Sequence, residues 1–596
     1  MAVVNKKFYN NETEYSDGSV EDEILDIVKN NDDYEDIINE DLRWPVFYHL
    51  SHLRENLFNW YPFRKDANLL EIGAGCGALT GLFCSRVSDV TAVELTERRS
   101  KIIYNRHKDL ENLELFPGNL NNMEFNKKFD YIILCGVLEY AYRFTKSDNP
   151  YVDFIKKIKS MLSEDGVILV AIENRIGLKY LSGSKEDHLG RWFVGINDYP
   201  DVKTVRTFSR FELEEVAKEA GFEHYKFFYP YPDYKFPHVI HTDELVEDMP
   251  VPFTAPNYDR SKVKLFEDHI FNYTLAQEGI SKYFANSFFL ELRNSDIPRE
   301  SDNLVYSKQS ASRDKKFRTC TSIYKKDNGY VVSKSPLTKE AKQHLEKMNS
   351  FSNHYFGKIK CLDSVMEDNN LSYEFIQSPN YSEQITDMIK SHSDKDKVIT
   401  KLKEIYFAMT ANASKREDFY TDEFKQVFGD KEIKEAFYGE DVSNIDLILF
   451  NLFNVNDEIV AIDYEWYFNF PVPIEYIFWR SLNYEIVHNK LFKNFFNMEE
   501  LFNAMEFDTD WIDTFRSWEN NFSKYVGSVP KPKQKIINGS SMVKKANESG
   551  KQLREKQKEI NKLKKENKKL KKKVKLMESS KSWKITKPLR SLKKSI

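Results

Sequence analysis

The stretch LLEIGAGCGALTGLF, residues 69–83, constrains the fold of this chain more than any other stretch. It reads as an apolar strand, a turn with glycine at every second position, and then a helix. Glycines let the backbone of such a turn adopt positive φ and pass close to a bound ligand. The pattern therefore predicts the first strand–helix unit of a ligand-binding α/β sheet.

Strand-like runs alternate with helical runs from residue 67 to about residue 225: ANLLEIGAG, VTAVEL, LELFPGN, YIILCGV and GVILVAIEN. This alternation predicts a doubly wound, Rossmann-like parallel sheet. A helix and a closing strand at 280–294 extend the domain, which we place at residues 44–296. We expect the acidic residues 1–43 to form a loosely packed helical leader in front of it.

Two polar side chains follow the next strands of this predicted sheet. Glu94 ends the second strand, where a carboxylate can accept both hydrogen bonds from a ribose diol. Asn119 follows the third strand, where its amide could meet an adenine ring. A dinucleotide-binding dehydrogenase also uses a glycine loop, but the second cofactor half and the hydride-handling site that it needs are not apparent.

With these features, residues 67–175 resemble a class I S-adenosylmethionine-dependent methyltransferase. The resemblance implies that S-adenosyl-L-methionine is the cofactor, that Glu94 holds its ribose and that Asn119 borders its adenine. It also implies that the methionine part lies against four residues of the turn: Glu71, Gly73, Gly75 and Gly77. The strand end CGVLEY, residues 135–140, then faces the transferred methyl group.

The stretch 173–198 is long, polar and glycine-spaced, and it follows the fifth predicted strand. A hydroxyl acceptor needs a general base, and we predict Asp187 and His188 as the catalytic residues, with Arg191 as an anion contact. An ordinary solvated lid is the alternative. His238 and His241 follow later, but two histidines alone do not define a metal site.

Residues 302–380 differ in sequence pattern from the predicted α/β domain, and residues 381–530 read as mostly helical. CTSIYKKDNGYVVSKSPL predicts two strands around an Asp-Asn-Gly turn, and the strand LSYEFIQ and several helices follow. NIDLILFNLFNVNDEIVAIDYEW, residues 444–466, then places Asp446 five residues before Asn451, and Asp463 at the end of a strand.

This order resembles the catalytic loop and the metal-binding strand of kinases, and it predicts an α+β two-lobed kinase-like domain at residues 302–530. The resemblance implies Asp446 as the base, Asn451 and Asp463 as ligands of Mg, and Lys334 as a contact to the phosphates of ATP. The partner of Lys334 could be Glu340 or Glu346.

Two departures from the kinase pattern leave the activity open. Asn444 stands where kinases usually have histidine, and residues 310–322 contain no glycine-rich phosphate loop. The pattern is open to three interpretations: an active kinase, a kinase-shaped binding domain, and a coincidental match.

The C-terminal region is basic. Residues 551–596 contain 19 Lys and Arg against 4 Glu, whereas the whole chain has a net charge of −5. After a polar linker at 531–550, residues 551–578 carry a heptad that predicts a short coiled coil and hence a homo-oligomer. The seam is Leu553, Ile560, Asn567 and Val574 on one position and Leu563, Leu570 and Met577 on the other. A lone solvated basic helix is the alternative.

The last 18 residues, 579–596, combine apolar side chains with six Lys and Arg. They resemble the ending of many cell-envelope glycosyltransferases and suit the surface of an anionic membrane. The apolar members are Trp583, Ile585, Leu589 and Leu592. Nucleic acid is not an expected partner, because no fold that reads RNA or DNA accompanies the basic tail. Without an apolar span or a secretory leader, we expect a cytoplasmic protein at the inner face of the cell membrane.

The order of domains resembles the bifunctional kinase–methyltransferase chain terminators of bacterial surface polysaccharides. That resemblance implies a glycan or lipid-linked glycan as substrate, phosphorylated by the second domain and then methylated, with a glycosyltransferase as partner. One alternative is methylation of a sugar hydroxyl beside an inactive kinase-like domain. A non-enzymatic scaffold of envelope glycan synthesis is the other.

Overall fold

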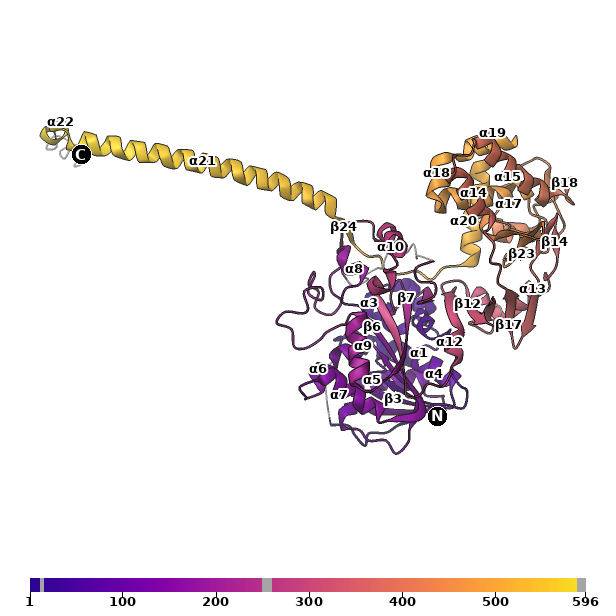
Figure 1. Ribbon diagram of the computed structural model, residues 1–596, viewed down its shortest axis with the longest axis horizontal. Coiled ribbons are helices and arrows are strands. Elements are labelled where there is room, and N and C mark those ends of the chain that lie inside the picture. The colour runs from indigo at the N-terminus through magenta and orange to yellow at the C-terminus, as the bar shows by residue number, and fades with distance from the viewer. Residues whose placement is uncertain (11–15, 249–259, 328, 587–596) are drawn as a thin grey trace.

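The computed structural model describes residues 1–10, 16–248, 260–327 and 329–586 (Figure 1). Its main feature is a sheet of 14 strands, in the order β1-β4-β3-β2-β5-β6-β10-β7-β8-β11-β12-β13-β17-β16. The sheet runs through both halves of the chain, and helices are inserted between its strands.

The first half contains the parallel sheet that the sequence predicts. Its parallel strands are β2 (Asn68–Ile72), β3 (Asp89–Glu94), β4 (Leu113–Pro117), β5 (Phe129–Cys135) and β6 (Leu162–Glu173). The helices between them include α4 (Thr80–Arg86), α5 (Glu97–His107) and α7 (Pro150–Lys159). Leu69 and Leu70 belong to two different buried clusters, so both faces of β2 are covered, as in doubly wound sheets. The predicted α/β class is therefore confirmed.

The acidic leader is packed more closely than the sequence suggested. Strand β1 (Val3–Val4) pairs in parallel with β4 at the edge of the sheet. Helix α1 (Val20–Asn30) buries Ile24 and Val28, and its Glu21 pairs with Arg99 of α5. Strand β1 and helix α1 thus extend the first domain, because the edge strand pairs with β4 and the amphipathic helix packs on α5.

The sheet does not end where the first predicted domain ends. After β10 (Ser287–Arg293) and β7 (His224–Tyr231), β8 (Val239–Thr242) pairs with β7 on one side and with β11 (Leu304–Gln309) on the other. Strands β12 (Thr319–Lys326) and β13 (Gly329–Pro336) form the predicted hairpin. Strands β17 (Asn370–Glu374) and β16 (Ser364–Glu367) complete the sheet.

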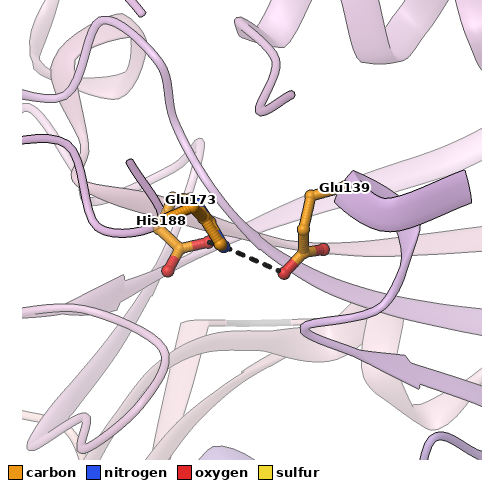
Figure 2. A group of neighbouring side chains, drawn as sticks. All are labelled: Glu139, Glu173 and His188. Atoms are coloured by element: carbon orange, nitrogen blue, oxygen red, sulfur yellow. Dashed lines mark ion pairs between the residues drawn. The ribbon is translucent and has the colours of Figure 1, made fainter. Parts of the chain in front are cut away.

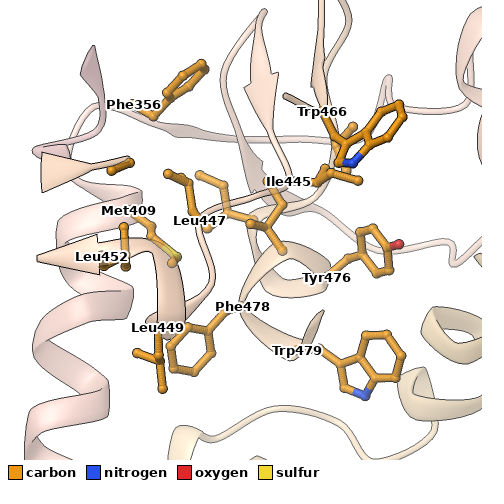
Figure 3. Close-up of a cluster of buried hydrophobic side chains, with 14 of the residues drawn as sticks. Phe356, Met409, Ile445, Leu447, Leu449, Leu452, Trp466, Tyr476, Phe478 and Trp479 are labelled. Carbon is orange, nitrogen blue, oxygen red and sulfur yellow. The ribbon is translucent and has the colours of Figure 1, made fainter. Parts of the chain in front are cut away.

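The remainder of the second half is mostly helical and has an aromatic core. Its helices are α13 (Ala341–Asn349), α14 (Tyr381–Lys390), α15 (Lys395–Thr410), α16 (Asp422–Phe428), α17 (Ile474–His488), α18 (Lys490–Phe495), α19 (Met498–Met505) and α20 (Trp511–Val526). Buried side chains of the 444–466 motif pack against α17, where Ile445 and Leu447 lie near Tyr476 and Phe478 (Figure 3). This core fixes the backbone that carries the motif.

The C-terminal region begins with a strand where a linker was expected. Strand β24 (Ile536–Asn538) pairs in parallel with β9 (Lys262–Lys264), and α21 (Gly539–Ser579) follows directly as a single helix of 41 residues. Figure 1 shows α21 extending away from the other elements. Helix α22 (Lys581–Ile585) ends the described part, and Leu589 and Leu592 lie outside the described residues. Across the described part of the chain, no helix combines the length and the apolar character needed to cross a membrane.

Candidate active site

A cavity of about 530 Å³ opens at the carboxyl ends of the parallel strands. The glycine turn after β2 lines one end, and residues that follow β5 and β6 line the other. Parallel α/β sheets bind their ligands at this edge. Seven residues that the sequence predicted line the same cavity: Glu71, Gly73, Gly75, Glu94, Asn119, Asp187 and His188.

The glycine turn requires glycine for two different reasons. Gly73 has a φ of +71°, and a Cβ atom there would lie 2.6 Å from Cγ2 of Val137. Gly77 has a φ of +75°, and its Cβ atom would lie 3.1 Å from Nε2 of His107. Gly77 is not among the residues that line the cavity, which departs from the prediction that it contacts the cofactor. Gly77 instead allows the turn to pack closely on His107 of α5.

The end of the cavity that the glycine turn lines is here called the cofactor end. Its two acidic residues, Glu71 and Glu94, have different environments. Oε2 of Glu94 accepts a 2.8 Å hydrogen bond from the backbone N–H of Gly75, and Oε1 accepts one from Thr96. Oε2 of Glu71 accepts a 2.6 Å bond from the hydroxyl of Thr80. Burial raises the pKa of Glu71 to about 8, so this side chain is largely a neutral acid at pH 7.

The leader contributes to the cofactor end of the cavity, which the sequence alone did not indicate. Asp17 lines it together with Trp44, Tyr48 and His49 of α3 (Trp44–Leu50). Asp17 is held by Arg99 at 2.8 Å and by Nε2 of His49 at 3.0 Å. The aromatic run at 44–66 was visible in the sequence, but only the fold places it over the glycine turn.

Asp187 and His188 lie together at the other end of the cavity, here called the acceptor end. Burial opposes ionisation of Asp187, but Lys179 at 2.8 Å and Lys235 at 3.5 Å hold its pKa well below the usual range. Burial lowers the pKa of His188, but the nearby carboxylates, Glu173 foremost, raise it well above the usual range. Both predicted catalytic residues are therefore charged here, and neither is a ready proton acceptor.

Two further carboxylates face His188, and the sequence alone did not single them out. Glu139 belongs to η3 (Leu138–Tyr140) after β5, and Glu173 ends β6. Nε2 of His188 lies 3.5 Å from Oε1 of Glu139 and 3.9 Å from Oε2 of Glu173 (Figure 2). Their positions at the ends of neighbouring parallel strands were the only indication in the sequence.

The second half brings together the residues of the 444–466 motif. Nζ of Lys334 lies 3.0 Å from Oδ1 of Asp463, and the side-chain amide of Asn451 donates to the backbone carbonyl of Asp446 at 3.0 Å. Burial raises the pKa of Asp446 to about 7, and the charge of Asp463 adds to this shift.

The partner of Lys334 is neither of the two glutamates proposed from the sequence. Glu465 takes this place: its Oε2 lies 3.5 Å from Nζ of Lys334, and it also pairs with Arg313. Helix α13 contributes His344, whose Nε2 lies 3.5 Å from Oε1 of Glu465.

The segment that replaces a glycine-rich loop packs inward. The ring centroid of Phe317, in η4 (Lys315–Phe317), lies 4.7 Å from that of Trp466 and 5.1 Å from that of His344. Phe317 is buried in the core of the second half, so this end of the segment is anchored there, and residues 310–322 have no glycine that would let the backbone pass close to phosphates.

Comparison with known proteins supports an assignment for the first half alone. Residues 43–226 match the family model described as a methyltransferase domain. The ribosomal RNA small subunit methyltransferase A of Malacoplasma penetrans is 29% identical over 83 residues, which make up 14% of this chain and 30% of that protein. The chain thus spans less than a third of the length of this curated relative.

Solved structures of methyltransferases are also similar to this chain. The complex of the Haloferax volcanii Trm112 methyltransferase activator with a methyltransferase matches at 14% identity, covering 45% of this chain and 95% of that chain, with a TM-score of 0.26. The phosphoethanolamine N-methyltransferase 1 of Haemonchus contortus matches at 13% identity, covering 46% and 50%, with a TM-score of 0.26. At these TM-scores the two likenesses carry no argument, and the family match is what identifies a methyltransferase domain at 43–226.

Proposed function

We propose that this chain uses its S-adenosylmethionine-dependent methyltransferase domain to methylate a hydroxyl group of a cell-surface glycan. One observation carries the proposal: a single cavity contains both the glycine turn with Glu94 and the polar cluster around His188. A donor and an acceptor bound at its two ends would meet inside it.

The residues at the cofactor end fit S-adenosylmethionine. A Cβ atom on Gly75 would have no atom within 4 Å, so the space beside this glycine is open, whereas Gly73 packs against Val137. Glu94 ends β3, where a carboxylate can accept from both hydroxyls of a ribose. When bound, the cofactor supplies a methyl group on a positively charged sulfur.

The contribution of the protein is alignment and electrostatics. The glycine turn and Glu94 would hold the donor, and Trp44 and Tyr48 of α3 line that end of the cavity. At the acceptor end, Lys235 neutralises Glu173, and Lys179 neutralises Asp187. These residues would hold the donor methyl group and the acceptor hydroxyl in line within one cavity.

The charges at the acceptor end favour a hydroxyl over a phosphate. Four carboxylates gather there: Glu139, Glu173, Glu186 and Asp187. The two lysines beside them are already paired with carboxylates. Protonated His188 offsets one more of the four charges. In the absence of a bound cation one negative charge remains, which repels a phosphate but not a neutral hydroxyl.

Phosphorylation of the glycan by the second half, followed by methylation of the phosphate, is the competing proposal. Lys334 beside Asp463, and the raised pKa of Asp446, support an ATP- and Mg-dependent kinase. The inward packing of Phe317 and the lack of glycine in residues 310–322 support a binding domain that retains the kinase shape. We favour the binding domain on these two grounds. The pairing of Lys334 with Glu465 does not decide between the two, because active kinases also pair this lysine with a glutamate.

The setting in envelope synthesis rests on the C-terminal region. The basic helix α21 and the amphipathic residues after it suit an anionic membrane surface, where lipid-linked glycans and a partner glycosyltransferase would be found. A non-enzymatic scaffold would use the same region and would make no use of the cavity.

Methyl transfer to extracted glycans, measured with a radiolabelled donor, tests the proposal. We expect labelled glycan from the full chain without ATP, and none from the Gly75→Arg variant. Dependence on ATP would favour the two-step reaction, and the Asp463→Ala variant would then lose phosphate and methyl together. A folded protein that binds neither S-adenosylmethionine nor S-adenosylhomocysteine in calorimetry would overturn the enzymatic proposal.

A further inference from the structure

We propose that Glu139, Glu173 and His188 form a binding site for a divalent metal ion at the acceptor end of the cavity. The role that we give the ion, activation of the acceptor hydroxyl, rests on the proposed methyl transfer. The site itself rests on the arrangement of the three side chains.

The three side chains come from three segments and converge on one point. One carboxylate oxygen of each glutamate and a ring nitrogen of His188 all lie within 4.8 Å of one another. Figure 2 shows both carboxylates turned toward the imidazole. Metal–ligand distances of about 2.0–2.2 Å separate neighbouring ligands by about 3–3.6 Å. The observed 3.5 Å and 3.9 Å from Nε2 of His188 to the two carboxylates need only a small contraction.

A third carboxylate, that of Glu186, orients the imidazole of His188 as carboxylates orient metal-bound histidines. Nδ1 of His188 lies 2.9 Å from Oε1 of Glu186, and the other oxygen of Glu186 accepts from the backbone N–H groups of His188 and Leu189. Because a carboxylate only accepts, Nδ1 donates and Nε2 is directed at Glu139 and Glu173. A carboxylate behind a metal-bound imidazole fixes the ring in this way.

Two oxygen atoms at the site lack partners, and this observation is independent of the clustering. Within the described residues, Oε2 of Glu139 and Oε2 of Glu173 are buried and have no hydrogen-bond partner. The two residues are 1% and 0% exposed. A buried acceptor without a partner costs about 1–3 kcal/mol, and more when it is charged. A cation bound there would satisfy Oε2 of Glu173, which faces His188. It would satisfy Oε2 of Glu139 when that carboxylate binds through both of its oxygens, because Oε1 is the atom that faces His188.

The ligand set indicates which ions fit. Two carboxylates and one imidazole are a hard to intermediate set, which suits Mn²⁺ or Mg²⁺ and disfavours soft ions. Three protein ligands leave coordination positions open, and the cavity reaches this point from the glycine turn. A sugar with two neighbouring hydroxyls could occupy two open positions.

Such an ion would activate the acceptor hydroxyl directly, and its binding would release any proton from Nε2 of His188. A hydroxyl bound to a divalent ion becomes more acidic, so its proton can be released to water without a strong base. The resulting oxygen attacks the methyl carbon, the new O–C bond forms, and the C–S bond breaks with its electron pair on sulfur. The ion keeps its oxidation state throughout.

Titration of the metal-free full chain with Mn²⁺, followed by electron paramagnetic resonance and calorimetry, tests the site. We expect one Mn²⁺ per chain, and loss of that binding in Glu139→Gln, Glu173→Gln and His188→Gln. Glu186→Gln should weaken binding about 10–100-fold, because it removes the support of the imidazole. Glu97→Gln on α5, whose carboxylate lies by Lys6 at the surface, is the matched control and should bind as the wild type does.

Binding of S-adenosylhomocysteine to each variant separates the possible failures. If the variants and the wild type bind S-adenosylhomocysteine but none of them binds Mn²⁺, Mg²⁺ or Zn²⁺, the cluster is an internal ion pair and the metal proposal is overturned. Binding of Mn²⁺ that survives in all three ligand variants would also overturn it. If the wild type binds Mn²⁺ and not S-adenosylhomocysteine, the metal site stands and the proposed function fails.

Discussion

The backbone N–H of Gly75 donates a 2.8 Å hydrogen bond to Oε2 of Glu94. The residue that we expect to hold the cofactor ribose is thus the same residue that fastens the glycine turn to β3. We therefore expect one carboxylate both to position the turn and to bind the donor.

Because Glu94 has both roles, we expect Glu94→Gln to weaken cofactor binding without lowering the stability of the protein. The amide oxygen can still accept from Gly75, but a neutral acceptor forms weaker hydrogen bonds with a diol. We expect the Kd for S-adenosylhomocysteine to rise about tenfold, equivalent to about 1.4 kcal/mol, with little change in thermal stability. Calorimetry checks this result, and Glu97→Gln serves as the control. An unchanged Kd would mean that Glu94 only supports the turn.

Gly73 offers a steric test of the turn. In Gly73→Ala the new Cβ atom would lie 2.6 Å from Cγ2 of Val137, at a φ of +71°. We expect a loss of about 1–3 kcal/mol in stability together with a loss of cofactor binding. Adding Val137→Ala removes the clashing atom and should restore part of the binding.

Gly279→Ala is the matched control for this test. Gly279 has a φ of +70°, but no atom lies within 4 Å of the place that a Cβ atom would take. The control therefore carries the backbone strain without the clash, and its cofactor binding should be normal. Equal effects of Gly73→Ala and Gly279→Ala on binding would argue against a role of the turn.

The environment of Glu71 predicts a dependence of stability on pH. Burial raises its pKa from 4.5 in the unfolded chain to about 8 in the folded protein. Between these values the folded state binds more protons, so this group contributes stability that falls as pH rises from about 4.5 to about 8. The slope for one proton is at most about 1.4 kcal/mol per pH unit.

Glu71→Gln should remove this dependence, since the amide does not ionise and its oxygen can still accept from Thr80. The variant should gain stability over the wild type as pH rises across this window. Thermal unfolding of both proteins at pH 5, 6.5 and 8 checks the result. A difference that is constant with pH would show that Glu71 is ionised in the folded protein.

The heptad of α21 predicts self-association. Leu563 and Leu570 are 56% and 60% exposed, although both belong to the apolar seam. Pairing with a second copy would bury them, against the repulsion of the many lysines. We expect the full chain to dimerise in sedimentation experiments, and more strongly at high salt, where repulsion is screened.

Replacing both Leu563 and Leu570 by lysine should give a monomer. Leu576→Lys is the control, because Leu576 is 70% exposed but lies off the seam. If the control and the double variant sediment alike, α21 does not pair through this heptad.

The parts of the fold that the sequence predicted are those set by local patterns. The turn at Gly73 and Gly75 follows from a strand, a glycine spacing and a helix, and the β12–β13 hairpin follows from an Asp-Asn-Gly turn. Neither requires knowledge of distant segments. The spacing of Asp446, Asn451 and Asp463 likewise described a local arrangement.

The parts that could not be predicted depend on long-range contacts. Val3 pairs with Glu114, and Ile240 pairs with Ser307 across the expected domain boundary, and no periodicity in either segment indicates its partner. Glu139 and Glu173 meet His188 only because β5 and β6 are neighbours. A list of polar residues in the sequence could not have separated them from the many other glutamates.

Helix α21 has a mechanical consequence. At a rise of 1.5 Å per residue, its 41 residues measure about 60 Å, which is longer than a typical domain is wide. If the basic end of this helix rests on a membrane, the helix would hold the cavity at a distance from the lipid surface. Acceptors on long polymers would then come within its reach more readily than sugars close to their lipid carrier.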